Sequence, residues 1–399
     1  MLKENDMLIN EKVNQSVSIL REFGIDCWVT FVRETALNGD PILPFLVDSA
    51  LTWHSAFIIT ASGRKIAIVG KYDRQSVEDL SVYDQVLDFV EGINEVFLKT
   101  MRSLNPKSIA INFSKESESC DGLTHGMYLT LMELLSEAGM QDRVVSAEQV
   151  ISAVRQRKSP YEIRLMKSAV RSAETILSEA GRFIKPGKTE AEVAEFMQKR
   201  VKHMGLDLAW DPKVCPSVFT GPDTAGAHYN PTKRVVKRGQ ILNIDFGVKV
   251  KGYCSDLQRT YYILNKGETR APAEVQRGFD TIVRSIEESR KAINIGVQGV
   301  GVDKVARDII TAAGYPEFPH GLGHQVGRFA HDGTALLGPA WEKYAEKPFV
   351  PIEENMVFTI EPRLPVHERG IATVEEMVIV RKSGAEFISR PQRKLILIH

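Results

Sequence analysis

Four acidic residues interrupt apolar stretches that otherwise have the pattern of buried β-strands. They form two pairs along the chain, Asp245 with Asp256 and Glu361 with Glu375. A single acid in a strand usually lies on the solvated face. Four acids on apolar strands cannot all be buried unless cations or protons neutralise them, because an unpaired buried carboxylate is very costly. The fold must therefore bring distant strands together around positive charge.

Each pair lies on strands that can return antiparallel. A turn at Val250–Gly252 would let Asp245 and Asp256 face one point, and the strands that carry Glu361 and Glu375 have the same arrangement. The sequence therefore predicts that two hairpins from different halves of the chain contribute carboxylates to one site.

A histidine lies between the two acidic pairs in the sequence. His324 belongs to the glycine-lined segment 319–327, which can approach a site closely. Oxygen ligands with one imidazole suit Mn²⁺, Co²⁺ or Zn²⁺, and four carboxylates can bridge two such ions roughly 3.5–4 Å apart. Arg259, Arg363 and the neighbouring histidines are the alternative counterions. The pattern favours a dinuclear metal site.

The length of the chain predicts two domains. At 399 residues it is too long for one ordinary hydrophobic core, and 43% of the residues are hydrophobic. We place a small α/β domain at 1–154 and a second domain at 155–399. Helical and strand periodicities alternate in the first domain, with helices at 13–23, 92–104 and 123–138 and strands at 27–32, 56–60, 66–69 and 108–112.

The second domain contains two successive helix–helix–strand units. Ser159 and Thr189 each precede a glutamate three residues later, a capping box that starts a helix. Two further helices are expected at about 273–293 and from near Asp303 to before Gly314. Strand-rich stretches follow each helical pair, at 214–264 and 355–390. Such a pseudo-duplicated domain would place corresponding strands across one cleft, where ligands usually bind.

Composition excludes several classes of protein. The 51 basic and 51 acidic residues give a formal net charge of zero, which disfavours binding to nucleic acid through bulk charge. No apolar run is long enough to span a bilayer, and the charged N-terminal residues do not form a secretory signal. The four dispersed cysteines are typical of free thiols in a reducing compartment. We therefore expect a cytoplasmic protein that binds neither nucleic acid nor membrane.

These motifs resemble the five-ligand signature of the pita-bread metallopeptidases, which include methionine aminopeptidase, aminopeptidase P and prolidase. The resemblance covers roughly 155–399 and is carried by Ile-Asp-Phe-Gly, Ser-Asp-Leu-Gln-Arg-Thr, His-Gly-Leu-Gly-His, Thr-Ile-Glu-Pro and Val-Glu-Glu. Residues 1–154 are similar in size and element order to the N-terminal domain of creatinase and prolidase. The resemblance implies a mixed α/β (α+β) protein in which this small domain precedes a pita-bread catalytic domain.

The resemblance also implies the roles of the site residues. Asp256 and Glu375 would bridge two divalent ions, Asp245 would chelate one of them, and His324 and Glu361 would complete the other. Manganese is the first candidate for these ions, and cobalt, zinc or iron are alternatives. Water between two such cations loses its proton readily, and Glu361 would pass that proton to the leaving amine.

Three further histidines are candidates for contact with the substrate. His228 and His331 match positions at which the resembling enzymes contact substrate and stabilise the oxyanion. His320, four residues before His324, is a weaker candidate for substrate contact. The alternative for any lone histidine is a structural or surface role.

The sequence departs from the proline-specific members at two positions. These proteins usually carry arginine where this chain has Thr373, and glycine where it has Arg363. If Glu361 and Glu375 are cross-strand neighbours, residues 363 and 373 face each other as well. Arg363 would then restore the positive charge lost at Thr373 and contact substrate. The alternative is an arginine that faces solvent.

The predicted activity is hydrolysis of the peptide bond between an N-terminal residue and proline, by an Xaa-Pro dipeptidase or Xaa-Pro aminopeptidase. Three alternatives remain: an aminopeptidase of broader specificity, a creatinase-like C–N hydrolase that works without metal, and a non-catalytic module that binds proteins. The resemblance further implies a homodimer.

Overall fold

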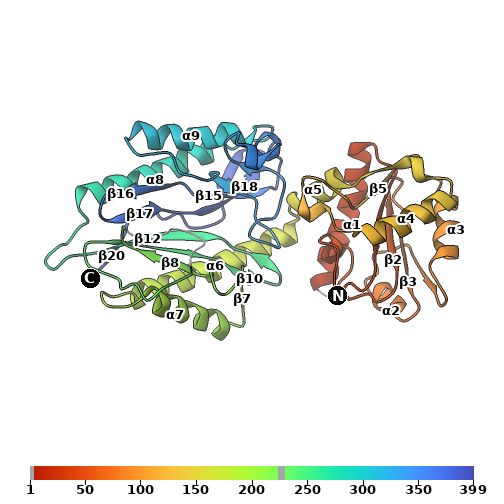
Figure 1. The fold of residues 1–399 in the computed structure, drawn as a ribbon, viewed down its shortest axis with the longest axis horizontal. Coiled ribbons are helices and arrows are strands. Elements are labelled where there is room, and N and C mark those ends of the chain that lie inside the picture. The colour runs from red at the N-terminus through yellow and green to blue at the C-terminus, as the bar shows by residue number, and fades with distance from the viewer. Residues whose placement is uncertain (1–3, 223–229) are drawn as a thin grey trace. The chain divides into compact units, whose positions relative to one another are not determined.

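The computed structural model describes residues 4–222 and 230–399. The chain divides into two compact units, Met1–Arg155 and Gln156–His399. Both units mix helices and strands (Figure 1). The described part of the chain contains no helix that is long and apolar enough to cross a membrane.

The first unit is built on a six-stranded sheet in the order β4-β3-β2-β1-β5-β6. The central strand β1 is antiparallel to β2 and parallel to β5, and β3 and β4 are also parallel. The helices are α1 (Glu4–Phe23), α2 (Arg74–Glu78), α3 (Asn94–Leu104), α4 (His125–Glu137) and α5 (Glu148–Gln156). The strands are β1 (Cys27–Val32), β2 (Ser55–Thr60), β3 (Lys65–Gly70), β4 (Gln85–Phe89), β5 (Ile109–Ile111) and β6 (Val144–Ser146).

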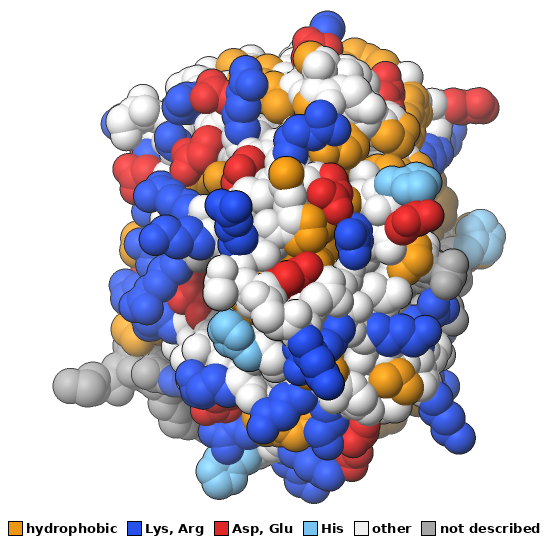
Figure 2. Space-filling view, turned by 90° about the vertical axis from the view of Figure 1, so that its left-hand side faces the viewer, with side chains coloured by type: hydrophobic (Ala, Val, Ile, Leu, Met, Phe, Trp, Pro, Cys, Tyr) orange, Lys and Arg blue, Asp and Glu red, His pale blue; other side chains and the backbone are white. Residues whose placement is uncertain are grey.

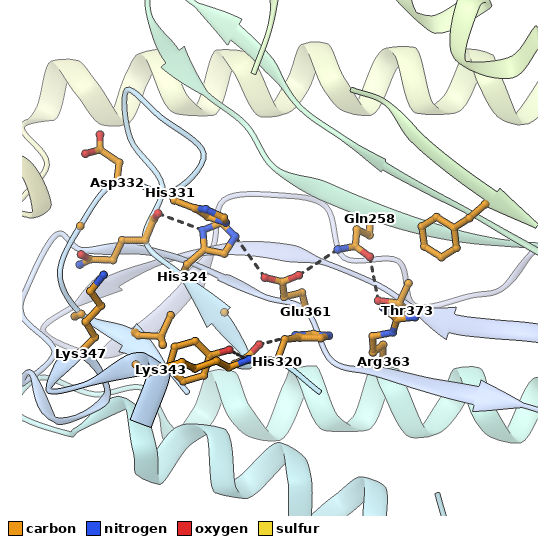
Figure 3. A pocket seen from close by; sticks show the side chains of 18 residues that line it. Gln258, His320, His324, His331, Asp332, Lys343, Lys347, Glu361, Arg363 and Thr373 are labelled. Atoms are coloured by element: carbon orange, nitrogen blue, oxygen red, sulfur yellow. Dashed lines mark hydrogen bonds and ion pairs between the residues drawn. The ribbon is translucent and has the colours of Figure 1, made fainter. Parts of the chain in front are cut away.

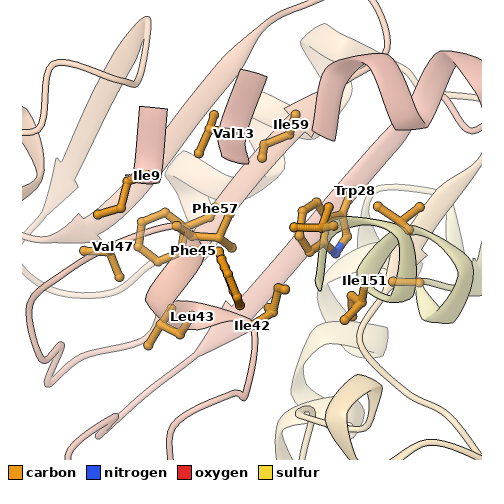
Figure 4. Packing of buried hydrophobic residues seen from close by; sticks show 14 of the residues in the cluster. Ile9, Val13, Trp28, Ile42, Leu43, Phe45, Val47, Phe57, Ile59 and Ile151 are labelled. Atoms are coloured by element: carbon orange, nitrogen blue, oxygen red, sulfur yellow. The ribbon is translucent and has the colours of Figure 1, made fainter. Parts of the chain in front are cut away.

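Alternating side chains of the sheet fill two separate cores. Trp28 of β1 and Phe57 of β2 pack with Val13 of α1 and Ile151 of α5 (Figure 4). The next residue along β1, Val29, faces the opposite core beside α3 and α4. Because neighbouring strand residues point to opposite faces, both faces of the sheet are covered, which explains why the inner strands β1, β2 and β5 are mostly apolar.

The second unit contains two pairs of helices, each pair followed by strands. The helices are α6 (Pro160–Phe183), α7 (Glu190–His203), α8 (Ala273–Ala292) and α9 (Gly299–Ala312). Both predicted capping boxes are present, with Ser159 and Glu162 at the start of α6 and Thr189 and Glu192 at the start of α7. The predicted helix near Asp303 is present as α9, with an earlier start. The helix begins four residues before Asp303, because tertiary packing overrides the low helix propensity of its glycines.

The strands of this unit form several small sheets rather than one continuous ladder. One has the order β20-β12-β9-β8 and another the order β15-β18-β19, and β16 pairs with β17. The strands are β7 (Asp207–Leu208), β8 (Ser217–Thr220), β9 (Ile241–Phe246), β10 (Val248–Val250), β11 (Tyr253–Cys254), β12 (Leu257–Ile263), β13 (Gly323–His324), β14 (Leu336–Leu337), β15 (Val357–Ile360), β16 (Arg363–Val366), β17 (Gly370–Thr373), β18 (Glu376–Arg381), β19 (Gly384–Phe387) and β20 (Ile396–Ile398). Helices α8 and α9 pack against each other, and α8 contacts β16 and β17.

The face of the molecule shown in Figure 2 is rich in charged side chains, and lysine and arginine outnumber the acids on it. Hydrophobic side chains are scattered over this face. Three of the acids that the sequence places on apolar strands of the second unit, Asp245, Asp256 and Glu375, lie instead in its interior, and Glu361 is partly buried.

Candidate metal centre

The first acidic pair lies where β9 and β12 run antiparallel. The chain turns back through Lys251 and Gly252, both with positive φ, which confirms the predicted turn. In the β9–β12 ladder Asp245 is opposite Gln258, and Asp256 lies just before β12 begins. Both aspartates are buried, and their side chains interact electrostatically. The two strands therefore bring both carboxylates to one place.

The second acidic pair lies at a break between two ladders of the same register. Ile360 pairs with Glu376 on one side of the break, and Arg363 pairs with Thr373 on the other. This shared register places Glu361 opposite Glu375 in the interruption. A carboxylate at such a break can point toward a site while the paired residues on both sides keep their places in the two ladders.

His324 is brought to these acids by close contact between its segment and β15. The backbone N–H of His324 donates to Thr359 Oγ1 at 3.1 Å, and Glu361 N–H donates to Leu322 O at 2.7 Å. A Cβ atom on Gly323 would lie 2.0 Å from Thr359 O, so this approach requires glycine.

A buried ion pair on α9 fixes the start of the same segment. Arg307 Nε lies 2.6 Å from Asp303 Oδ2, and both residues are almost fully buried. Asp303 accepts a hydrogen bond from Leu322 N–H, while Arg307 donates to the carbonyl oxygens of Phe318 and His320. The helix thereby holds the chain on the N-terminal side of His324.

The acids converge on the imidazole of His324. Its Nε2 lies 3.4 Å from Glu361, 3.7 Å from Asp256 and 4.0 Å from Glu375, measured to the nearest carboxylate oxygen of each. Atoms of Asp256, His324 and Glu375 are close enough together to hold one metal ion. Asp245 belongs to the same cluster, because its charge raises the pKa of Glu375.

The pKa values of the acids in the cluster are those expected of a site that binds a cation. Burial, together with neighbouring carboxylates, raises the pKa of Asp245 and Glu375 well above the ordinary range, and burial raises that of Asp256 to about 7. Glu361 differs, because the hydrogen bond and charge of His324 outweigh the effect of burial and lower its pKa.

Two buried oxygens of the cluster lack a hydrogen-bond donor within the described residues. Asp245 Oδ1 and Glu375 Oε1 accept no hydrogen bond from the described residues. The nearby guanidinium of Arg259 lies 3.1 Å from Glu376 and also donates to the backbone carbonyl oxygens of Gln258 and Glu375. Its N–H groups therefore already have other acceptors. A buried carboxylate oxygen without a hydrogen-bond donor is energetically costly. Carboxylate and imidazole groups are ligands that suit divalent ions.

A cavity of about 460 Å³ opens beside the cluster. His324 and Glu361 line it, and the ring of His331 lies edge-on against His324 with the centroids 4.1 Å apart (Figure 3). His320 also lines the cavity, and burial lowers its pKa. Arg363 reaches the same cavity, which gives it access to a substrate. The fourth predicted substrate contact, His228, lies outside the described residues.

Sequence reasoning missed the residues that hold Glu361 from the far side. Gln258 Nε2 donates to Glu361 Oε2 at 3.2 Å, and Thr373 Oγ1 lies 3.1 Å from Gln258 Oε1 (Figure 3). The alternation of β12 could have identified Gln258, since it lies two residues after Asp256 and therefore shares a face with it. Lys343 and Lys347 also line the cavity. No sequence motif predicted a role for either lysine.

All four cysteines are free, as predicted, and all four are buried. Burial raises the pKa of both Cys215 and Cys254 to about 12. Neither thiol is therefore poised to act as a ligand or a nucleophile at neutral pH.

Comparison with known proteins agrees with the fold. A Mycoplasma genitalium protein provisionally named an Xaa-Pro aminopeptidase is 29% identical over 389 residues, which cover 95% of this chain and 98% of that protein. The structure of an X-Pro aminopeptidase from Thermotoga maritima MSB8 superposes with a TM-score of 0.69 at 23% identity, over 97% of this chain and 99% of the other. The structure of an Xaa-Pro dipeptidase from Bacillus anthracis superposes with a TM-score of 0.71 at 22% identity, over 98% of this chain and 100% of the other.

The fold is thus the mixed α/β pita-bread fold of prolidases, which confirms the predicted fold class. The family model of metallopeptidase family M24 matches residues 164–382, more than half of the chain and the whole of the candidate metal centre. Such enzymes use divalent metal and cleave peptides. On these grounds the chain is a metallopeptidase that belongs to family M24.

Proposed function

We propose that this protein hydrolyses the peptide bond between an N-terminal residue and proline, with two divalent metal ions. One observation carries the proposal: three carboxylates lie within 4.0 Å of His324 Nε2 at the wall of a cavity, and two buried carboxylate oxygens of the same cluster accept no hydrogen bond from the described residues. The provisional name of the Mycoplasma genitalium relative, Xaa-Pro aminopeptidase, supports proline specificity.

Five residues would hold the ions. These are Asp245, Asp256, His324, Glu361 and Glu375, with Asp256 and Glu375 as the bridging pair. The ions, when bound, would lower the pKa of water to near neutrality. Manganese is our first candidate, since a set dominated by carboxylates suits a hard divalent ion, and cobalt, zinc and iron remain alternatives.

Within this site Glu361 is the group that moves the proton. Its carboxylate lies at the cavity wall and its lowered pKa keeps it ionised at neutral pH, as a proton acceptor must be. It accepts the proton of the attacking water and delivers it to the amine nitrogen that leaves with proline. His331, together with His228, stabilises the developing oxyanion. His320 and Arg363 contact the substrate.

The test is hydrolysis by the full chain, freed of metal by chelation and reconstituted with Mn²⁺. The substrates are an Xaa-Pro dipeptide, an Xaa-Pro-Xaa tripeptide and the same tripeptide with alanine in place of proline. We expect Mn²⁺-dependent cleavage of at least one proline peptide and much slower cleavage of the alanine peptide. The ratio between dipeptide and tripeptide then separates a dipeptidase from an aminopeptidase.

Two outcomes would contradict the proposal. Equal cleavage of the proline and alanine peptides would indicate an aminopeptidase of broader specificity. Lack of cleavage, together with lack of bound Mn, Co, Zn or Fe after reconstitution, would favour a metal-independent hydrolase or a protein-binding module.

We further propose that the protein is a cytoplasmic homodimer. The free, buried thiols support a reducing compartment, and the dimer follows from the resemblance to the prolidase branch. Light scattering coupled to size-exclusion chromatography would test the oligomeric state, because a monomer has a mass of 44.6 kDa.

A further inference from the structure

The two carboxylate oxygens of Glu361 face different partners. Oε1 lies 3.4 Å from His324 Nε2, on the side of the metal cluster. Oε2 accepts a hydrogen bond from the side-chain amide of Gln258 at 3.2 Å. Gln258 comes from β12, far from Glu361 in the sequence, and is 4% exposed. The amide therefore holds one oxygen while the other remains directed at the cluster.

The amide of Gln258 is itself oriented by a second buried side chain. Thr373 Oγ1 lies 3.1 Å from Gln258 Oε1 and 3.2 Å from the carbonyl oxygen of Pro362, and Thr373 is 3% exposed. A glutamine amide can present either its oxygen or its NH₂ group to a neighbour, and its hydrogen-bond partners decide which. A hydroxyl that donates to Oε1 directs the NH₂ group at Glu361. The carboxylate thus meets a donor rather than a repelling oxygen.

The side chain of Gln258 is not needed to join the strands. The backbone of Gln258 already bonds to Glu375, through Glu375 N–H to Gln258 O at 3.2 Å and Gln258 N–H to Glu375 O at 3.4 Å. Burial lowers the pKa of Arg363, and the charge of Glu361 acts in the opposite direction. No hydrogen bond joins these two side chains within the described residues. In this part of the chain the neutral amide, rather than the arginine, contacts Glu361 Oε2.

We propose that Gln258 is a positioning residue for Glu361 and that Thr373 sets the orientation of its amide. The inference rests on the proposed function, in which Glu361 is both a metal ligand and the proton acceptor. Without the amide the carboxylate can rotate about its terminal bond, which would weaken metal binding and misplace the proton acceptor. Outer hydrogen-bond partners of metal ligands typically contribute about 10–100-fold in affinity or activity.

The test uses three variants of the full chain. Thr373→Val keeps the shape of the side chain but removes the hydroxyl, Thr373→Ser keeps the hydroxyl, and Gln258→Met removes the amide at similar size. Metal affinity is measured by calorimetric titration of Mn²⁺ into metal-free protein. The kcat and KM for an Xaa-Pro peptide are measured on the reconstituted enzyme, and thermal unfolding of the metal-free proteins monitors folding.

We expect Thr373→Val and Gln258→Met to weaken Mn²⁺ binding by about 10-fold or more and to lower kcat, with KM within about 2-fold of the original. Thr373→Ser should restore both quantities. This rescue separates hydrogen bonding from simple packing, since valine fills the same space. The pair of variants at residue 373 decides the question even if Gln258→Met does not fold.

Unchanged Mn²⁺ affinity and kcat in Thr373→Val would overturn this inference alone, provided that the original protein binds Mn²⁺ and cleaves Xaa-Pro peptides. Equal losses in Thr373→Ser and Thr373→Val would overturn it as well, because the hydroxyl would then be irrelevant. Failure of the original protein to bind any of the candidate metals would instead overturn the proposed function, and this inference with it.

Discussion

Arg363 of β16 is paired directly with Thr373 of β17. This confirms the predicted register, in which the two residues that differ from the proline-specific pattern face each other. Arg363 lines the cavity, whereas Thr373 contacts the amide that holds Glu361. The two departures therefore have different surroundings, and the role of Arg363 in substrate binding stays a prediction.

Replacement of Arg363 tests that role. Arg363→Gly should raise KM for Xaa-Pro peptides by about 10-fold, because a half-buried guanidinium can form a charge-assisted hydrogen bond with the substrate. Steady-state kinetics with Arg363→Lys as the control would separate charge from geometry. Unchanged KM, kcat and metal affinity in the glycine variant would mean that this arginine has no part in the reaction.

Removal of a bridging ligand should abolish activity without unfolding the protein. We expect Asp256→Ala to remain folded and to lose at least ~100-fold in turnover, since ligands matter at least as much as their outer partners. Circular dichroism and peptide hydrolysis would measure both effects. The matched control is Asp308→Asn, whose carboxylate pairs with Lys304 on the exposed face of α9 and should leave turnover unchanged. Near-normal turnover in Asp256→Ala would exclude a bridging role.

The metal should stabilise the protein more as the pH rises. An aspartate in the unfolded chain ionises near pH 4, whereas Asp256 in the folded, metal-free site has a pKa of about 7. Between these values the folded state retains protons that the unfolded state has lost, so the free energy of unfolding of the metal-free protein falls as the pH rises. A bound cation favours the ionised carboxylates and removes this fall.

Differential scanning calorimetry at pH 5 and pH 7.5 measures this effect. The difference in Tm between Mn²⁺-loaded and metal-free protein should be larger at pH 7.5. A difference that is constant or smaller at pH 7.5 would show that the buried carboxylates do not control stability in this way.

The ion pair of α9 should stabilise both the fold and the position of His324. Asp303→Asn leaves the buried guanidinium of Arg307 without its counterion and should lower the free energy of unfolding by about 3–5 kcal/mol. Asp308→Asn, on the same helix but exposed, should change it by no more than about 1 kcal/mol. Urea denaturation of the metal-free proteins would give both values, and similar values for the two variants would contradict the proposed role of the pair.

The close approach at Gly323 gives a further test. Gly323→Ala should displace the segment that carries His324, because the new Cβ would lie 2.0 Å from Thr359 O, and Mn²⁺ affinity should fall with it. Gly301→Ala in α9 is the control, since its Cβ would meet nothing within 4 Å and alanine favours the helix. Equal Mn²⁺ affinity in the two variants would show that the histidine segment can relax.

The sequence by itself determined the features that depend on neighbours along the chain. Ser159 with Glu162 marks the start of α6, because both capping hydrogen bonds form within four residues. The acids on apolar strands indicated a charged interior site, because burial of carboxylates has a cost that holds in any fold. Spacing along the chain was also enough to predict that Arg363 and Thr373 face each other, since one register continues through Glu361 and Glu375.

The tertiary structure decided which side chains surround those acids. Gln258 and Glu361 are 103 residues apart, and their hydrogen bond exists because β12 is bridged at Gln258 to Glu375, which lies opposite Glu361. Likewise, the partners that Asp303 and Arg307 find near His320 depend on how α9 packs. Hydrogen bonds of this kind require donor and acceptor to meet within about 3 Å. Local sequence patterns cannot specify such distances, because they follow from the packing of the whole unit.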